Sequence, residues 1–170
     1  DIVVAGGMEN MSQIPHYIQM RNGVKFGSTK LTDGLQLDGL TDVYDQCAMG
    51  VFADQCATTH EISREDQDHF AKSSYERSQK AWDEGKFNNE VVAVSVPQRR
   101  GEPKLVTQDE EFNNVVIDKI PNLRPAFTKE GTVTAANAST INDGAGAIIL
   151  MSEEKAKELG IKPLAFIKSY

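Results

Sequence analysis

The spacing of hydrophobic residues predicts several short strands along the chain. Aliphatic runs at 2–5, 90–96, 147–151 and 164–170 are rich in Val, Ile and Leu and have the length of strands. The Gly6-Gly7 pair indicates a turn directly after the first run. A basic segment containing glycine and proline follows the second run, which predicts a hairpin-like connection there.

Segments with the hydrophobic periodicity of helices lie between these predicted strands. Residues 49–60 have the pattern of a short helix, and Ser63-Arg-Glu-Asp66 is a capping box that opens a longer helix ending near Glu84. Packing within the chain explains the aromatic positions of this longer helix, Phe70 and Trp82. A third helix over 152–160 has a serine cap, acidic residues in its first turn and a terminal glycine. Because it lies between two predicted strands, we expect an α/β layer.

A long segment between the first strand and about residue 45 shows neither period. It is rich in Gly, Asp, Asn and Thr. Connections of this length inside compact proteins usually cover a site or form an interface. We therefore expect an excursion that serves function or subunit contact.

The charge of the chain excludes some partners. The formal net charge is -7 at pH 7, which would repel nucleic acid. No apolar run approaches the roughly 18 residues that a membrane helix needs. Basic residues that can still hold a phosphate-bearing ligand locally are Arg99, Arg100, Lys104 and Lys119. We expect neither nucleic acid nor a membrane as partner.

Neither the cysteines nor the histidines form a catalytic or zinc-binding pattern. No neighbouring cation that would activate a thiol is plain beside Cys47 or Cys56. Cys56 falls four residues after Phe52, the spacing of a buried helix face. The histidines, His16, His60 and His69, are not spaced as paired metal ligands. We expect reduced thiols and no zinc site.

A run of small residues over 131–147 leads into the predicted strand 147–151. Glycine and alanine let the backbone approach a ligand or another backbone closely, and Asn137, Ser139 and Asn142 add hydrogen-bonding groups. The run therefore fits either the lining of a polar-headed ligand or a tight packing seam without a ligand.

The string from Val3 to Gln13, read with this run, resembles the thiolase family, and within it the acetoacetyl-CoA thiolases (acetyl-CoA C-acetyltransferases). The resemblance covers the whole chain. Further matching blocks are Asp38–Asp42, Ala48–Gly50, Ser63–Asp68, Glu84–Glu90 and Leu123–Phe127. Several ordered blocks are more specific than any one of them.

The resemblance implies an α/β, thiolase-like fold and a central fragment of a longer enzyme. Residues 1–12 would end the N-terminal half, 13–130 would form a loop domain with tetramer contacts and coenzyme A-binding segments, and 131–170 would return to the core and start the C-terminal half. The nucleophilic cysteine, the histidine and the second cysteine are expected outside the chain. We expect no catalytic residue here and no activity from the fragment alone.

The implied reaction is the reversible condensation of two acetyl-CoA to acetoacetyl-CoA through an acetyl-cysteine. The enzyme would be a homotetramer that requires no cofactor, located in the cytoplasm, or in the mitochondrion of a eukaryote. Two alternatives stay open: a non-catalytic coenzyme A-binding or oligomer-interface module, and a degradative 3-ketoacyl-CoA thiolase.

Carried over position by position, the resemblance implies a coenzyme A-binding set: Leu40, Met49, Asn114, Val115, Lys119, Phe127, Ala135 and Ser139. A common family arginine corresponds to Asn114 or Asn113, and a frequent histidine beside Met49 is replaced by Ala48. Loss of the guanidinium removes a bidentate phosphate contact. A potassium site, with potassium activation, is implied by a second set: Tyr75, Ala135, Ala136 and Ala138.

Overall fold

The computed structural model describes residues 1–169, which form two compact units. One unit contains residues 1–39 together with the segment from Ile141 onward, and the other is continuous from Leu40 to Thr140. This partition follows contacts within the chain. The expected division of the parent enzyme at residues 12 and 130 stays a prediction.

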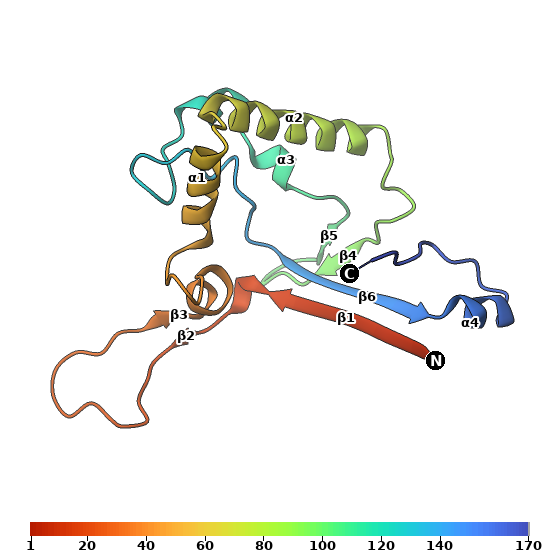
Figure 1. The fold of residues 1–170 in the computed structure, drawn as a ribbon, viewed down its shortest axis with the longest axis horizontal. Coiled ribbons are helices and arrows are strands. Elements are labelled where there is room, and N and C mark those ends of the chain that lie inside the picture. The colour runs from red at the N-terminus through yellow and green to blue at the C-terminus, as the bar shows by residue number, and fades with distance from the viewer. Residues whose placement is uncertain (170) are drawn as a thin grey trace. The chain divides into compact units, whose positions relative to one another are not determined.

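The first unit is built on one antiparallel strand pair, β1 (Ile2–Asn10) and β6 (Asp143–Met151) (Figure 1). Gly6 faces Ala147 and Gly7 faces Gly146 across this pair. The predicted turn at Gly6-Gly7 is therefore wrong, because both glycines lie inside β1. The final strand also begins at Asp143, within the small-residue run, rather than at residue 147.

Two features hold the register of β1 against β6. A Cβ on Gly6 would meet the Gly146 carbonyl oxygen at 2.7 Å, so the backbones approach where no side chain fits. At the other end, the Ser12 backbone N–H donates to Asp143 Oδ1 at 2.9 Å, and its hydroxyl donates to Asp143 Oδ2. The Ser12 hydroxyl and then its backbone N–H lower the pKa of the exposed Asp143 carboxyl.

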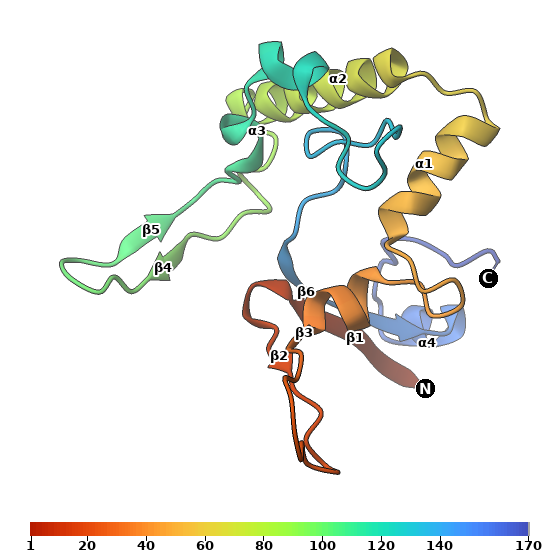
Figure 2. The same cartoon turned by 90° about the vertical axis from the view of Figure 1, so that its left-hand side faces the viewer.

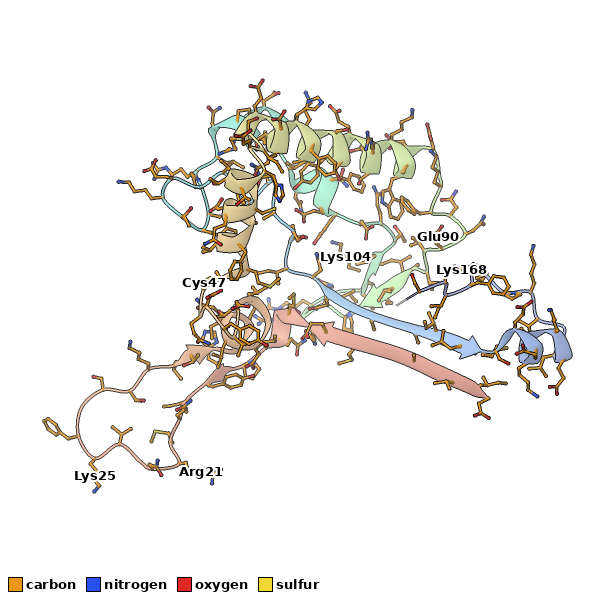
Figure 3. The ribbon with its side chains drawn as sticks, in the orientation of Figure 1. Arg21, Lys25, Cys47, Glu90, Lys104 and Lys168 are labelled. Carbon is orange, nitrogen blue, oxygen red and sulfur yellow. The ribbon has the colours of Figure 1, made fainter. Side chains whose placement is uncertain are left out.

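The rest of this unit is mostly irregular, as expected. Its short elements are η1 (Met11–Gln13), β2 (His16–Tyr17), β3 (Thr32–Asp33) and α4 (Glu153–Glu158). Arg21 and Lys25 lie at the far end of the loop between β2 and β3 (Figure 3). Residues 164–169 contain no strand, which contradicts the prediction for them, and Tyr170 lies outside the described residues. A π-helical turn, η2 (Leu35–Leu40), leads toward the second unit.

The second unit contains the predicted helices, α1 (Met49–Thr59) and α2 (Arg64–Asp83). The predicted cap at Ser63 is confirmed: Ser63 Oγ accepts from the Asp66 N–H at 3.0 Å and donates to Asp66 Oδ2 at 2.6 Å. Gly85 follows α2 with a φ of 66°, a left-handed conformation that suits glycine. Local sequence signals therefore set both ends of α2.

Shorter elements complete this unit. They are β4 (Val94–Val96), β5 (Lys104–Val106), α3 (Glu111–Asn114) and η3 (Ile117–Asn122). The hairpin is confirmed, because β4 and β5 pair and extend as an arm away from α2 (Figure 2). The preceding strand is shorter than predicted, since residues 91–93 lack regular structure.

The core of the second unit lies between α2, α3 and η3. Trp82 of α2 contacts Phe87 at 5.0 Å and Phe112 of α3 at 6.4 Å between ring centroids, and Ile120 of η3 is buried. Two expectations are wrong within this chain. Phe70 is 72% exposed rather than packed, and Cys56 is exposed rather than on a buried face. Among the described residues, no helix has the length and apolar character that a membrane span requires.

We expect substitution of the two adjacent glycines of β1 to have unequal effects on stability. In the intact protein, Gly6→Ala should lower the free energy of unfolding by about 1–3 kcal/mol, because the new methyl group overpacks against the β6 backbone. Gly7→Ala is the matched control, since a Cβ there meets no described atom within 4 Å. Chemical denaturation measures both variants. Equal losses from the two substitutions would contradict the close approach at Gly6.

Candidate functional site

A buried carboxylate on α1 holds the start of the small-residue run. Asp54 is 7% exposed, and its Oδ1 accepts from the backbone N–H groups of Thr132 and Val133, each at 2.9 Å. Its Oδ2 accepts from the Thr128 hydroxyl at 2.7 Å. Burial alone would raise the pKa of Asp54, but these hydrogen bonds outweigh it and leave the pKa lowered. The loop 128–133 is thus fixed to α1.

Asn137 fixes the next part of the run to α2. Its Nδ2 donates to Asp68 Oδ1 at 3.0 Å and to the Thr132 carbonyl at 3.1 Å. Its Oδ1 accepts from the Thr134 N–H at 2.7 Å. Because every polar group of the Asn137 amide is used, its side chain serves the fold and is not free for a ligand.

Arg64 connects the same network to η3. Its Nε donates to Asp68 Oδ2 at 2.7 Å, and its Nη2 donates to the carbonyls of Ile120 and Leu123, each at 3.0 Å. The guanidinium is partly exposed while the Asp68 carboxylate is nearly buried, and the two carbonyls add acceptors that support this ion pair. The helix α2, the run 131–138 and the segment after α3 are therefore held as one frame.

This frame borders an open pocket of about 270 Å³. The lining comes from α2, α3, η3 and the small-residue run. Its residues are Tyr75, Glu111, Asn114, Val115, Val116, Lys119, Ile120, Leu123, Ala135 and Ala136. The pocket combines apolar walls with one ammonium, one carboxylate and one phenol, a combination suited to an elongated ligand carrying a charged group.

The pocket brings together predicted residues that are distant in the sequence. Asn114, Val115, Lys119 and Ala135 of the coenzyme A-binding set all line it. Of the potassium set, Tyr75, Ala135 and Ala136 line it as well. Glu111, Val116, Ile120 and Leu123 are lining residues that were not predicted. The sequence marks these residues only weakly. A glutamate in an acidic segment resembles an ordinary surface residue, and an isolated aliphatic residue resembles an ordinary core residue.

Tyr75 faces the backbone of the alanine run. Its hydroxyl donates to the Ala136 carbonyl at 3.1 Å. Burial and then the nearby Glu111 carboxylate raise the pKa of Tyr75, so the phenol stays protonated and neutral near pH 7. A neutral hydroxyl beside a carbonyl oxygen is suited to a hard monovalent cation, and equally to a hydrogen bond.

Three predicted apolar residues gather at the beginning of α1. A β-bridge between Thr41 and Ala48 brings Leu40 and Met49, the residues flanking it, to the same place. The Phe127 ring lies against the first turn of α1, at Gly50. Leu40 is half-buried, whereas Met49 is 58% and Phe127 43% exposed. We call these three residues the apolar wall; each of them keeps part of its surface exposed within the described part of the chain.

The remaining predicted residues lie outside the lining of the pocket. Ser139 is exposed, and Ala138 is half-buried with its N–H donated to the Thr134 carbonyl at 3.0 Å. In residues 1–169, His, Cys, Asp and Glu form no group of three or more that could hold a metal ion. Cys47 lies beside the turn that precedes α1 (Figure 3), where its carbonyl accepts from the Asp42 N–H at 2.9 Å.

A second hollow of about 920 Å³ lies along the first half of α2 and η3. Most of its lining residues are charged, and several of them already serve the fold: Asp68 binds Arg64, and Asp66 binds the cap residue Ser63. It contains none of the predicted binding residues. We therefore assign the candidate site to the smaller pocket and to the apolar wall of Leu40, Met49 and Phe127.

Comparison with known proteins shows which proteins this chain is similar to. The thiolase N-terminal domain family matches residues 1–154. A probable acetyl-CoA acetyltransferase of Dictyostelium discoideum is 55% identical over 169 residues, 99% of this chain and 41% of that protein. An acetyl-CoA acetyltransferase of Saccharomyces cerevisiae is 53% identical over 173 residues, 100% of this chain and 44% of that protein.

A solved structure shows the same fold. The crystal structure of a thiolase from Ascaris suum in complex with coenzyme A matches with a TM-score of 0.84 and 45% identity, over 95% of this chain and 41% of that chain. The fold is therefore an α/β fold of the thiolase type. The chain belongs to the thiolase family. It spans about two-fifths of the length of the curated relatives it matches.

Removing the Asp54 carboxylate should destabilise the second unit. In the intact protein, Asp54→Ala leaves the Thr128 hydroxyl and two buried N–H groups without their acceptor, which should cost about 3 kcal/mol. Because the folded-state pKa is lowered, Asp54 contributes stability above its unfolded pKa of about 3.9, and this contribution is lost as the pH falls through the folded value.

Urea denaturation between pH 7 and pH 3 measures both effects. The wild-type protein should lose stability more steeply below about pH 4 than Asp54→Asn, which has no carboxyl to protonate. Asp109→Asn, at an exposed position, is the control. Identical pH profiles for the wild type and Asp54→Asn would contradict the role given to this carboxylate.

Proposed function

We propose that the intact protein is an acetyl-CoA acetyltransferase, which condenses two acetyl-CoA reversibly to acetoacetyl-CoA and coenzyme A. The observation that carries the proposal is the pocket that gathers Asn114, Val115, Lys119 and Ala135. The names of the curated relatives and the coenzyme A in the Ascaris suum complex support it. A homotetramer and a cytoplasmic or mitochondrial location stay predictions.

In this proposal, residues 40–140 bind and orient coenzyme A. The Lys119 ammonium attracts the phosphate end of the ligand, and Val115 packs beside it. Leu40, Met49 and Phe127 face the slender pantetheine chain. The hydroxyl of Ser139, in the small-residue run, forms a hydrogen bond with one of the pantetheine amides. Asn114 offers an amide where an arginine is common, so the phosphate end is held with less charge.

The chemical step requires groups expected outside these residues. A cysteine thiolate attacks the acetyl thioester, which yields acetyl-cysteine and releases coenzyme A as thiolate. A base then removes a methyl proton from the second acetyl-CoA. The resulting carbanion attacks acetyl-cysteine, forms the new carbon–carbon bond and frees the cysteine. The contribution proposed for this chain is to hold the thioester in place for both transfers.

Lys119 gives the first test of this proposal. The purified intact protein should cleave acetoacetyl-CoA in the presence of coenzyme A. Lys119→Ala should raise KM for the coenzyme about 10-fold with little change in kcat, because the lost charge contact is equally present in the ground and transition states. Lys129→Ala, an exposed lysine of the same unit, is the control. No turnover by the wild type contradicts the function, whereas an unchanged KM contradicts only the role of Lys119.

We also propose that potassium binds at Tyr75. The Tyr75 hydroxyl and the Ala136 carbonyl are brought together, and Ala135 lines the same pocket, which fits part of the implied ligand set; Ala138 lies farther along the run. When bound, such a cation would neutralise carbonyl charge beneath the ligand. The ligands that this chain supplies are a neutral phenol oxygen and backbone carbonyl oxygens. In this proposal, their spacing favours potassium over sodium.

The intact protein is therefore expected to react faster in potassium chloride than in sodium chloride at equal ionic strength. Tyr75→Phe should remove this difference, because the phenol oxygen is lost while the ring stays. Tyr44→Phe, at a tyrosine that is 90% exposed, should keep it. Equal wild-type rates in the two salts would count against the cation site.

A further inference from the structure

Gly50 lies in a helix that does not require glycine. It is the second residue of α1, and its backbone is not among the positive-φ positions of the chain. Glycine is a poorer helix former than alanine, so the backbone conformation does not explain it. The reason lies outside the helix: a Cβ on Gly50 would collide with Cγ, Cδ2 and Cε2 of the Phe127 ring.

The Phe127 backbone cannot easily move away from this contact. On one side, the Ala126 N–H donates to the Val133 carbonyl at 2.8 Å. On the other side, the Thr128 hydroxyl donates to Asp54 at 2.7 Å. Asp54 is four residues after Gly50 and therefore lies on the same face of α1. The carboxylate thus fixes the loop on the helix, and Gly50 provides the space that the ring then occupies.

The position of the ring determines the shape of the apolar wall. The face of the Phe127 ring lies on Gly50, because a Cβ there would be almost equidistant from Cγ, Cδ2 and Cε2. Phe127 is nevertheless 43% exposed, and Met49, the residue before Gly50, is 58% exposed. A methyl group on Gly50 would strike ring atoms that include Cγ, which cannot swing aside as the tip of a flexible side chain can. The ring would have to leave its present place on α1.

We propose that Gly50 is a positioning residue of the acyl-CoA site, which keeps the Phe127 ring flat against α1 and so keeps the pantetheine slot open. This inference rests on the function proposed above. Gly50 itself touches no ligand and acts only through the ring. Its effect is therefore on binding of the coenzyme and depends on the presence of Phe127.

A double-mutant cycle in the intact protein tests this role. Gly50→Ala should raise KM for acetoacetyl-CoA about 10-fold with kcat within about twofold, and should lower the melting temperature by several degrees. In a Phe127→Ala background, the same substitution should leave KM unchanged and raise the melting temperature slightly, because alanine favours the helix. Gly39→Ala is the control, since its Cβ would meet only Leu35 Cδ1, at 3.9 Å.

The two readouts separate the inference from the function. A wild type without turnover contradicts the proposed function, while the melting temperatures and calorimetric titration with coenzyme A still test Gly50. Additive effects in the cycle, or an unchanged KM and affinity for Gly50→Ala, would overturn the positioning role. If Gly50→Ala alone does not fold, recovery of a folded protein by the double substitution supports the proposed collision, and failure of the double variant to recover overturns it.

Discussion

The buried carboxylate of Asp54 is the interaction on which the rest of the site depends. A charge removed from water is costly unless several donors surround it, and here a hydroxyl and two backbone N–H groups do so. Those donors belong to a loop without helix or strand, which has no ladder to order it. The hydrogen bonds that satisfy Asp54 therefore also give that loop its conformation.

The placement of the residues on either side of the loop follows from this anchoring. Thr134, with no exposed surface, and the carbonyl of Ala136 come directly after the anchored loop, and Phe127 comes directly before it. Asn137 and Arg64 extend the same polar frame to α2 and η3. The composition of the small-residue run allowed either a packing seam or the lining of a ligand site. In the structure the run packs against α1 and α2, and Ala135 also lines the pocket.

Features that depend on neighbouring residues were predictable from the sequence, and features that depend on distant partners were not. The cap at Ser63 and the hairpin of β4 and β5 are local and were found. The Gly6-Gly7 pair predicted a turn because glycine weakens a strand, except where another backbone approaches closely. The backbone that approaches here belongs to β6, which lies near the other end of the chain. Asp54 is 74 residues from Thr128, so nothing in its surroundings marks it as a hub.

For the candidate site, the family resemblance identified binding residues that hydrophobic periodicity could not identify. It selected Asn114, Val115, Lys119 and Ala135 before any geometry was known, and the structure places them around one pocket. It did not indicate Glu111, whose carboxylate shares that pocket with Lys119. Nor did it indicate that Phe70 and Cys56 are exposed, because burial depends on which elements cover a helix face.

The pairing of β1 with β6 has a consequence for how the protein is made. Ile2 pairs with Met151, so the ribosome must synthesise the whole intervening chain before this ladder can close. At about 5–20 residues per second, β1 waits on the order of ten seconds with its apolar residues unpaired. Residues 40–140 are continuous in sequence and can collapse during that interval. Folding during synthesis would then run from the inserted unit outward, with the flanking strands joining last.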